Sequence, residues 1–239
     1  KNLGEEALMV PKFNLNFKKF SFNRKSLKNE EEEEDPWPFK KTVCDTVESA
    51  VKEHPYLESY LNNLPEPPKY VPTLDAGKIE KETNIMYPLG LGIYAHVTVG
   101  GEISRYTLIE PPKPDRELLD KIETAVARLI EDKDYGNQKE KILAALFKRA
   151  IKSRMVKLPK GIDEKNLLYH FLREKIGHGF LDGFLADPAL EDISIPGAGN
   201  IFVYHKLFGH LETSVNVSKN EIDNLLRSIS ERYGKVLSY

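Results

Sequence analysis

The sequence contains a single cysteine, Cys44, among 239 residues. One cysteine cannot form an internal disulfide, and it excludes every metal site that needs two or more thiolates. A chain without disulfides is typical of a reducing compartment. We expect Cys44 to be a small buried thiol on an apolar helix, because free cysteines pack like small hydrophobic residues.

Long apolar runs and an excess of charge of one sign are also missing. No run approaches the roughly 18 residues that a membrane-spanning helix needs, and no secretory leader is recognisable, which predicts a soluble chain. The 35 basic residues nearly balance the 37 acidic ones. Such a chain has no global field to concentrate nucleic acid or acidic lipid, so any such contact would be local.

The sequence lacks the motifs of common catalytic sites. It has no G-x-x-x-x-G-K-[ST] phosphate loop, no G-x-S-x-G nucleophile elbow and no H-E-x-x-H zinc motif. Gly197-Ala198-Gly199 precedes a strand rather than a helix, so a turn is predicted there instead of an anion site. Glu191 and Asp192 could form an acid/base pair, but adjacent residues of a strand point to opposite faces.

Histidines are the remaining candidates for a metal site. His170 and His178 are eight residues apart with a helix end between them, whereas His205 and His210 flank a loop and could approach one another in a hairpin. Two imidazoles would still need a third ligand, and no spacing supplies it. The sequence therefore predicts no metal site, no cofactor held by this chain and no enzymatic activity of its own.

The first 35 residues divide into a basic-aromatic arm and an acidic linker. Residues 11–28 interleave Phe with Lys and Arg, and residues 30–35 form an unbroken acidic run. Like charges in series resist compaction, so the run is predicted to be solvated. The arm could contact a partner or anionic lipid, but we expect an alternating aromatic strand that lies on its own domain.

The next part of the chain predicts one helix and one hairpin. Thr42 and Asp45 resemble a capping box ahead of apolar residues at helical spacing. The prolines of residues 65–72 predict an extended connector. Residues 82–110 have a β pattern, and Gly100-Gly101 predicts a tight turn between two antiparallel strands.

Apolar stripes predict three further helices, at residues 118–129, 142–150 and 163–176. Gly177 is expected to end the third helix as a left-handed cap. Asp187 and Pro188 are interpreted as an N-cap and a first-turn proline.

The last part of the chain predicts three strands, at residues 193–195, 201–205 and 211–217, followed by a helix. Ser218 and Glu221 form a capping box at the start of that helix. The fold class is therefore α+β, with antiparallel β units flanked by helices. We divide the chain into an arm and linker (1–35), a helix plus β-rich subdomain (36–112), a helical connector (113–160) and an α/β domain (161–239).

The stretch IGHGFLDGFLADPALEDISIPGAGNIFVYHKLFGHLETSVNV, with the helix after it, resembles the N-terminal region of the type II/IV secretion ATPases, above all the archaeal pilus and archaellum assembly ATPases. The resemblance covers roughly residues 165–239. Ser214-Val215-Asn216 departs from it, because Thr-Asn-Val is usual there. The matching residues are Gly177, Gly179, Asp187, Pro188, Glu191, Asp192, Ile193, His205, Phe208, Gly209, Thr213, Arg232 and Gly234.

The resemblance implies that residues 161–239 are a PAS-like domain that sits above a RecA-like motor and closes over ATP. ATP and Mg²⁺ would belong to the parent protein, whose motor would follow Tyr239. The implied partners are that motor, the neighbouring subunits of a hexamer and a membrane platform protein. The implied location is cytoplasmic, peripheral to the membrane through those partners, and no nucleic acid is expected.

Two arginines of the last helix are the candidates for contact with nucleotide. The resemblance implies that arginines of this domain approach the γ-phosphate held by the motor, and Arg232 and Arg227 fit that role. Such arginines can contribute about a thousandfold to turnover. The alternatives are a self-standing protein-interaction module without a motor and a nucleic-acid-binding domain, although the latter needs a basic stripe that the helices lack.

Overall fold

The computed structural model describes residues 13–14, 37–38, 44–75, 83–130 and 138–233. The side chains of residues 13–14 and 231–233 lie outside this description. The strands are β1 (Phe13–Asn14), β2 (Lys69–Tyr70), β3 (Asn84–Gly90), β4 (Ile93–Thr98), β5 (Arg105–Ile109), β6 (Leu190–Ile195), β7 (Gly199–His205) and β8 (Gly209–Val217). The helices are α1 (Val47–Glu53), α2 (Tyr56–Asn62), α4 (Arg116–Ala127), α5 (Lys139–Lys152), α6 (Glu164–Ile176), α7 (Asp182–Leu185) and α8 (Lys219–Tyr233), with a 3-10 turn at Gly179–Leu181.

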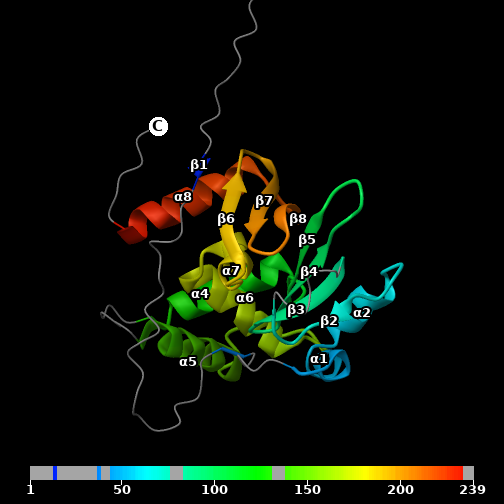
Figure 1. Ribbon diagram of the computed structural model, residues 1–239. Helices are drawn as coiled ribbons and strands as arrows, with labels where there is room; N and C mark the ends of the chain where they lie inside the picture. The colour runs from blue at the N-terminus through cyan, green and yellow to red at the C-terminus, as the bar shows by residue number, and fades with distance from the viewer. Residues whose placement is uncertain (1–12, 15–36, 39–43, 76–82, 131–137, 234–239) are drawn as a thin grey trace, which may run out of the picture.

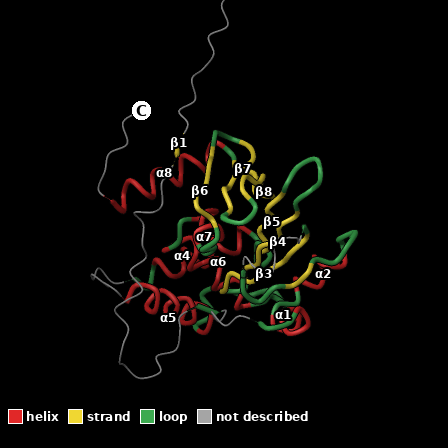
Figure 2. The backbone as a smooth tube through the Cα atoms, viewed as in Figure 1, coloured by secondary structure: helices red, strands yellow, loops and turns green. Residues whose placement is uncertain are grey.

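The fold is α+β and is organised around one mixed sheet (Figures 1 and 2). The strand order is β1-β6-β7-β8-β5-β4-β3-β2. Two antiparallel meanders, β3-β4-β5 and β6-β7-β8, are joined by a parallel pair in which Arg105 lies opposite Glu212 and Tyr106 opposite Thr213. The sheet is therefore continuous across the divisions that the sequence suggested at residues 112 and 160.

Helices cover the sheet on both faces, and a separate helical core lies beside it. Phe184 of α7 and Leu225 of α8 pack on one face with inward residues of both meanders, including Tyr87 and Ile193. Residues of α1 and α2 pack on the other face against Met86 and Tyr94. The helices α4, α5 and α6 bury their apolar stripes against one another, and they are grouped together in Figure 1.

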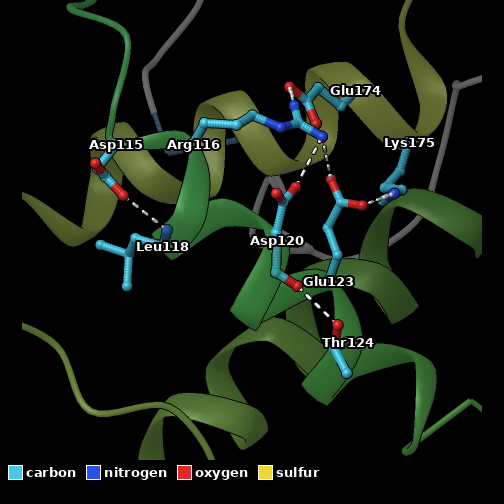
Figure 3. A network of polar contacts seen from close by, with 8 residues as sticks. All are labelled: Asp115, Arg116, Leu118, Asp120, Glu123, Thr124, Glu174 and Lys175. Carbon is cyan, nitrogen blue, oxygen red and sulfur yellow. Dashed lines mark hydrogen bonds and ion pairs between the residues drawn. The ribbon is translucent and has the colours of Figure 1, made fainter.

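Charged side chains connect α4 to α6 at the surface of the helical core (Figure 3). The guanidinium of Arg116 lies 2.6 Å from Glu174 and 2.9 Å from Asp120, and Lys175 lies 2.6 Å from Glu123. Arg116 is largely exposed, so each of its ion pairs contributes little on its own.

Local patterns predicted most of these elements correctly. The three amphipathic stripes are α4, α5 and α6, and the predicted C-terminal strands are β6, β7 and β8. The capping box of α8 is confirmed, because Ser218 N–H donates to Glu221 at 2.8 Å while Glu221 N–H donates to the Ser218 hydroxyl at 3.3 Å. The backbone N–H and the hydroxyl of Ser218, which both donate to the Glu221 carboxylate, lower its pKa. The turn at Gly197-Ala198-Gly199 is also confirmed, between β6 and β7.

Two predictions on the first meander were wrong. Residues 82–110 form three strands rather than two, because the chain reverses at Gly90-Leu91-Gly92 inside what reads as one apolar run. The antiparallel pairing of β4 and β5 is confirmed, but their connection is longer than a two-residue Gly-Gly turn. Gly100, with φ +91°, supplies the left-handed conformation within it.

The first helix begins later than predicted. Thr46 caps α1 by a reciprocal capping box with Ser49, so Asp45 precedes the cap, while Thr42 lies outside the described residues. Cys44 consequently lies before the helix, not on it, and is half-buried beside Glu53 at 3.3 Å. Burial raises the pKa of the Cys44 thiol, which disfavours the nucleophilic thiolate.

Candidate functional site

The carboxylate of Asp187 is the centre of a buried polar cluster. Its Oδ2 accepts hydrogen bonds from the hydroxyls of Tyr87, at 2.6 Å, and Tyr106, at 2.8 Å. Its Oδ1 accepts from the backbone N–H of Ala189 at 2.8 Å. Asp187 is 4% exposed, and both tyrosines are buried. The carboxylate therefore joins β3, β5 and the turn that leads into β6.

His205 completes this cluster and has a defined tautomer. Its Nδ1 accepts from the backbone N–H of Leu207 at 3.1 Å, so Nε2 carries the proton. Nε2 lies 3.1 Å from the Tyr87 hydroxyl, which is already donating to Asp187, and therefore donates to it. Burial lowers the pKa of His205, so the ring is neutral at pH 7. Cluster A, defined as Tyr87, Tyr106, Asp187 and His205, is a continuous chain of satisfied donors and acceptors.

The hydrogen bonds of cluster A connect strands of both meanders. Burial and the nearby Asp187 carboxylate raise the pKa of Tyr87 and of Tyr106 far above neutrality. The tyrosines therefore remain donors and His205 remains uncharged at physiological pH. These two tyrosines and His205 are therefore not poised to gain or lose a proton near pH 7, as a general acid or base would be.

The N-cap role predicted for Asp187 was wrong. The helix α7 ends at Leu185, before Asp187, and Pro188 opens a turn into β6 instead of a helix. Asp187 and His205 were both singled out from sequence, but Tyr87 and Tyr106 were not. Tyr87 is 100 residues from Asp187 along the chain and Tyr106 is 81 residues away. The only local signal was their placement on the inward side of alternating strands.

The glycines of Gly177-His178-Gly179, which we call the GxG turn, are required for different reasons. Gly177 ends α6, but its φ of −78° and ψ of −173° are extended, so the predicted left-handed cap was wrong. A Cβ at Gly177 would meet Asp182 Oδ2 at 2.1 Å and the Arg173 carbonyl oxygen at 2.4 Å. Gly179 does adopt the left-handed region, with φ +61°, and its surroundings are open.

Arg173 connects the GxG turn to the sheet. It is 8% exposed, its Nη1 lies 2.7 Å from Glu110 at the end of β5, and its Nε donates to the Gly179 carbonyl at 2.9 Å. Asp182 lies 3.6 Å from the same Nε. This buried cation was not singled out from sequence, and it joins α6, the turn and the sheet.

The remaining motif residues occupy strand and turn positions. Glu191 is exposed and Asp192 half-buried at an irregularity in the β6–β7 pairing, and no contact joins their carboxylates. Ile193 is buried in the sheet core. Thr213 is buried in β8, where its hydroxyl accepts from Val215 N–H at 3.2 Å, and Gly209 begins that strand with φ +70°.

The histidine pairs considered for a metal are separated. His205 is buried inward from β7, whereas His210 is exposed on β8 and its ring contacts Tyr204 at 4.8 Å between centroids. His170 bonds to the carbonyls of Pro111 and Pro112, each at 3.1 Å. In the described part of the chain, no three His, Cys, Asp or Glu side chains are arranged to hold a metal ion.

Burial of neutral histidine makes stability depend on pH, and His170 has the largest effect. Burial lowers its pKa from 6.5 to about 4. The unfolded chain therefore binds a proton below pH 6.5 while the folded chain binds it only near pH 4, so stability falls as the pH drops through this window. The unfolding free energy falls by about 1.4 kcal/mol for each pH unit within this window, which gives a total loss of up to about 3 kcal/mol.

We expect His170→Gln to flatten the dependence of the unfolding free energy on pH between 6.5 and 4. Urea unfolding at several pH values measures it, with His210→Gln at an exposed position as the control. An unchanged slope in His170→Gln would show that this ring is not held neutral.

The two candidate arginines lie on α8. Arg227 is exposed, on the side away from Ile222 and Leu225, which pack on the sheet. Arg232 belongs to the same helix, but its side chain lies outside the described residues, and so does the whole of Gly234. In the described part of the chain, no ion pair involves Arg227.

Among the described residues, no helix is both long and apolar enough to cross a bilayer.

Two proteins of Methanocaldococcus jannaschii are similar to the chain. Uncharacterized protein MJ1288 is 31% identical over 188 residues, which are 76% of this chain and 72% of that protein. The chain belongs to the family of MJ1288. Uncharacterized protein MJ0900 is 27% identical over 222 residues, which are 80% of this chain. The chain spans only 40% of the length of MJ0900. No protein-family model matches this member of the MJ1288 family.

Proposed function

We propose that the chain is a non-catalytic N-terminal part of a hexameric ATPase that assembles an archaeal surface filament or a secretion pseudopilus. It acts in docking, in assembly of the hexamer and in closure over ATP bound by a RecA-like motor domain. Residues 161–239 are then its PAS-like domain, and the parent protein is cytoplasmic, held at the membrane through a platform protein. ATP and Mg²⁺ belong to the motor, and nucleic acid is not a partner.

The observation that carries this proposal is cluster A. Asp187 and His205, two residues of the motif that resembles the secretion ATPases, lie in one buried hydrogen-bonded network in which the His205 ring is neutral. Gly177 and Gly179 lie at the turn that Arg173 connects to the sheet. A motif whose residues hold a scaffold together fits a domain that supports chemistry performed elsewhere.

Arg227 is the side chain that would approach the nucleotide bound by the motor. It is exposed on α8. The inner side of the same helix is fixed by Leu225, which is buried in the sheet core. A guanidinium presented by a rigid helix can stabilise the charge that develops on a transferred phosphate. Arg232 is the second candidate on the same helix.

The test uses the full-length protein that contains both this chain and the motor. We expect Arg227→Ala to lower ATP turnover at saturating ATP by at least about tenfold without loss of fold, and Arg232→Ala to behave alike if both reach nucleotide. Arg128→Ala, at an exposed position of α4, is the matched control and should leave turnover unchanged. Unchanged turnover in both α8 variants would contradict the proposed role of α8.

A second measurement tests the non-catalytic part of the proposal. The isolated chain should neither hydrolyse ATP nor bind it with micromolar affinity, because the phosphate loop belongs to the motor. Isothermal titration calorimetry with Mg²⁺-ATP measures this directly. Micromolar binding by the chain alone would contradict the proposal.

One observation favours a protein-interaction module without a motor. The match to MJ1288 takes up 72% of that protein, so little of MJ1288 lies outside it. The side chains of Phe202 and Tyr204 are also 41% and 38% exposed on the outer side of β7. If the α8 variants leave turnover unchanged while Phe202→Ser abolishes binding of a partner protein, this second function would replace the first.

A further inference from the structure

The strand β7 carries two exposed aromatic side chains on one of its faces. Phe202 is 41% exposed and Tyr204 is 38% exposed, whereas Ile201 and Val203 are buried in the sheet core with Leu225 of α8. Successive residues of a strand point to opposite faces, so both rings lie on the face turned away from α8. β7 itself lies between β6 and β8 in the sheet (Figure 1).

A carboxylate lies beside each of these rings. Asp192 of β6 is directly opposite Tyr204, and Glu212 of β8 is directly opposite Phe202. Directly opposed residues share a face of the sheet, and diagonal neighbours are still within reach of long or aromatic side chains. Two rings in the middle strand are therefore flanked by one carboxylate on either side. We call these four residues the aromatic-acidic face.

Neither carboxylate is paired with a cation. None of the ion pairs that the described residues form involves Asp192 or Glu212. The side-chain amide of Asn200 donates to Glu212 and its oxygen accepts from Asn216 at 3.0 Å, which orients the carboxylate without neutralising it. Arg105 is opposite Glu212 on β5, but no ion pair of the described residues joins the two.

The helices on this side of the sheet cover the other meander. Ile109 follows Arg105 at an even spacing along β5, so it lies on the same face as Glu212, and it is buried with Met86 and Tyr94 against α1 and α2. Among the described residues, no member of β6, β7 or β8 belongs to that core. The rings of the aromatic-acidic face also belong to none of the other cores of the described residues.

We propose that the aromatic-acidic face binds an arginine-bearing extended segment of a protein partner. A guanidinium stacks on an aromatic ring and pairs with a carboxylate at the same time, which an ammonium does less well. The face offers both groups side by side on paired strands. This proposal does not depend on the motor, and it gives the partner of the interaction-module alternative its chemistry.

Charge favours this ligand over a nucleic acid. Exposed aromatic residues on an open sheet can also stack on the bases of single-stranded RNA. The phosphates of such a ligand would lie near Asp192 and Glu212, and like charges repel one another. A basic segment brings the opposite charge to the same two carboxylates, so it is the complementary partner.

Fluorescence anisotropy of a labelled peptide, titrated with the full chain, tests the proposal. The probe alternates arginine with threonine, so that its arginines lie on one side when it is extended. The control probe carries citrulline in place of arginine, which keeps the shape and removes the charge. We expect the arginine peptide to bind at least about tenfold more tightly than the citrulline peptide, and salt to weaken its binding.

Variants of the chain separate the contributions of ring and charge. Phe202→Ala should weaken binding of the arginine peptide by at least about tenfold. Asp192→Asn keeps the side-chain shape and should weaken it by about threefold. The matched controls are Ile103→Ala, at a 51% exposed residue between β4 and β5, and Glu58→Gln, at an exposed position of α2. Both controls should bind like the wild type, and circular dichroism checks that each variant is folded.

Several outcomes would overturn the proposal. The chain could fail to bind the arginine peptide at millimolar concentration, or bind both peptides equally. Asp192→Asn and Phe202→Ala could both bind like the wild type. Tighter binding of a poly-dT oligonucleotide would make nucleic acid the ligand, and a dimer that Phe202→Ala dissociates in analytical ultracentrifugation would make a second copy the occupant. None of these results depends on ATP turnover, so this proposal and the motor proposal fail separately.

Discussion

Asp187→Ala is expected to lower the free energy of unfolding by about 3–5 kcal/mol, through the loss of one acceptor that serves three buried donors. The hydroxyls of Tyr87 and Tyr106 and the N–H of Ala189 all donate to this carboxylate. Neither tyrosine can turn to water, because both are buried. Each buried donor without an acceptor costs about 1–3 kcal/mol, so the losses combine into one of the largest effects available in this chain.

Urea unfolding followed by circular dichroism measures this change. Asp187→Asn keeps one carbonyl oxygen for the tyrosines and should lie between the wild type and Asp187→Ala. Asp192→Ala, on the neighbouring strand at a half-buried position, is the control and should cost about 0.5 kcal/mol or less. A cost below 1 kcal/mol for Asp187→Ala would mean that the cluster does not hold the sheet together.

Gly177→Ala is the second large effect, about 3 kcal/mol, and its cause is steric. The backbone at Gly177 has an ordinary negative φ of −78°, so alanine brings no conformational strain. The added methyl carbon would lie 2.4 Å from the Arg173 carbonyl oxygen and 2.1 Å from Asp182. The first contact is with the backbone of α6, so the end of that helix must move, together with the Arg173 bonds to the sheet.

Gly179→Ala is the matched control for this substitution. Its φ of +61° is left-handed, but no atom beyond the neighbouring residues of the chain lies within 4 Å of the new methyl carbon. The cost should therefore be only the left-handed strain, about 1–2 kcal/mol. Thermal and urea unfolding of both variants separate the two causes. If Gly179→Ala is the more destabilising, conformation rather than packing governs the pair.

The candidate site was only half visible in the sequence. Asp187 and His205 could be named from a motif, and their turn and strand positions followed from the residues around them. Tyr87 and Tyr106 could not be found, because nothing near them in the sequence marks them as partners of an acid about a hundred residues away. The N-cap assigned to Asp187 was wrong because Pro188 opens a turn into β6, and two of the three donors to this carboxylate are distant tyrosines.

The sequence by itself determined the elements that local geometry encodes. The stripes of α4, α5 and α6 and the Ser218–Glu221 box depend only on residues three or four positions apart, which the helical backbone brings together whatever surrounds it. Even there, the start of α1 moved to Thr46, because several residues can serve as caps and local pattern does not choose between them.

Only the tertiary structure decided how those elements meet. The parallel pairing of β5 with β8 joins two meanders that each look complete in sequence. Gly177 is required by a neighbouring carbonyl rather than by its own backbone angles. Contacts of this kind depend on where distant segments pack, and packing is a property of the whole core, so no window of neighbouring residues contains the information.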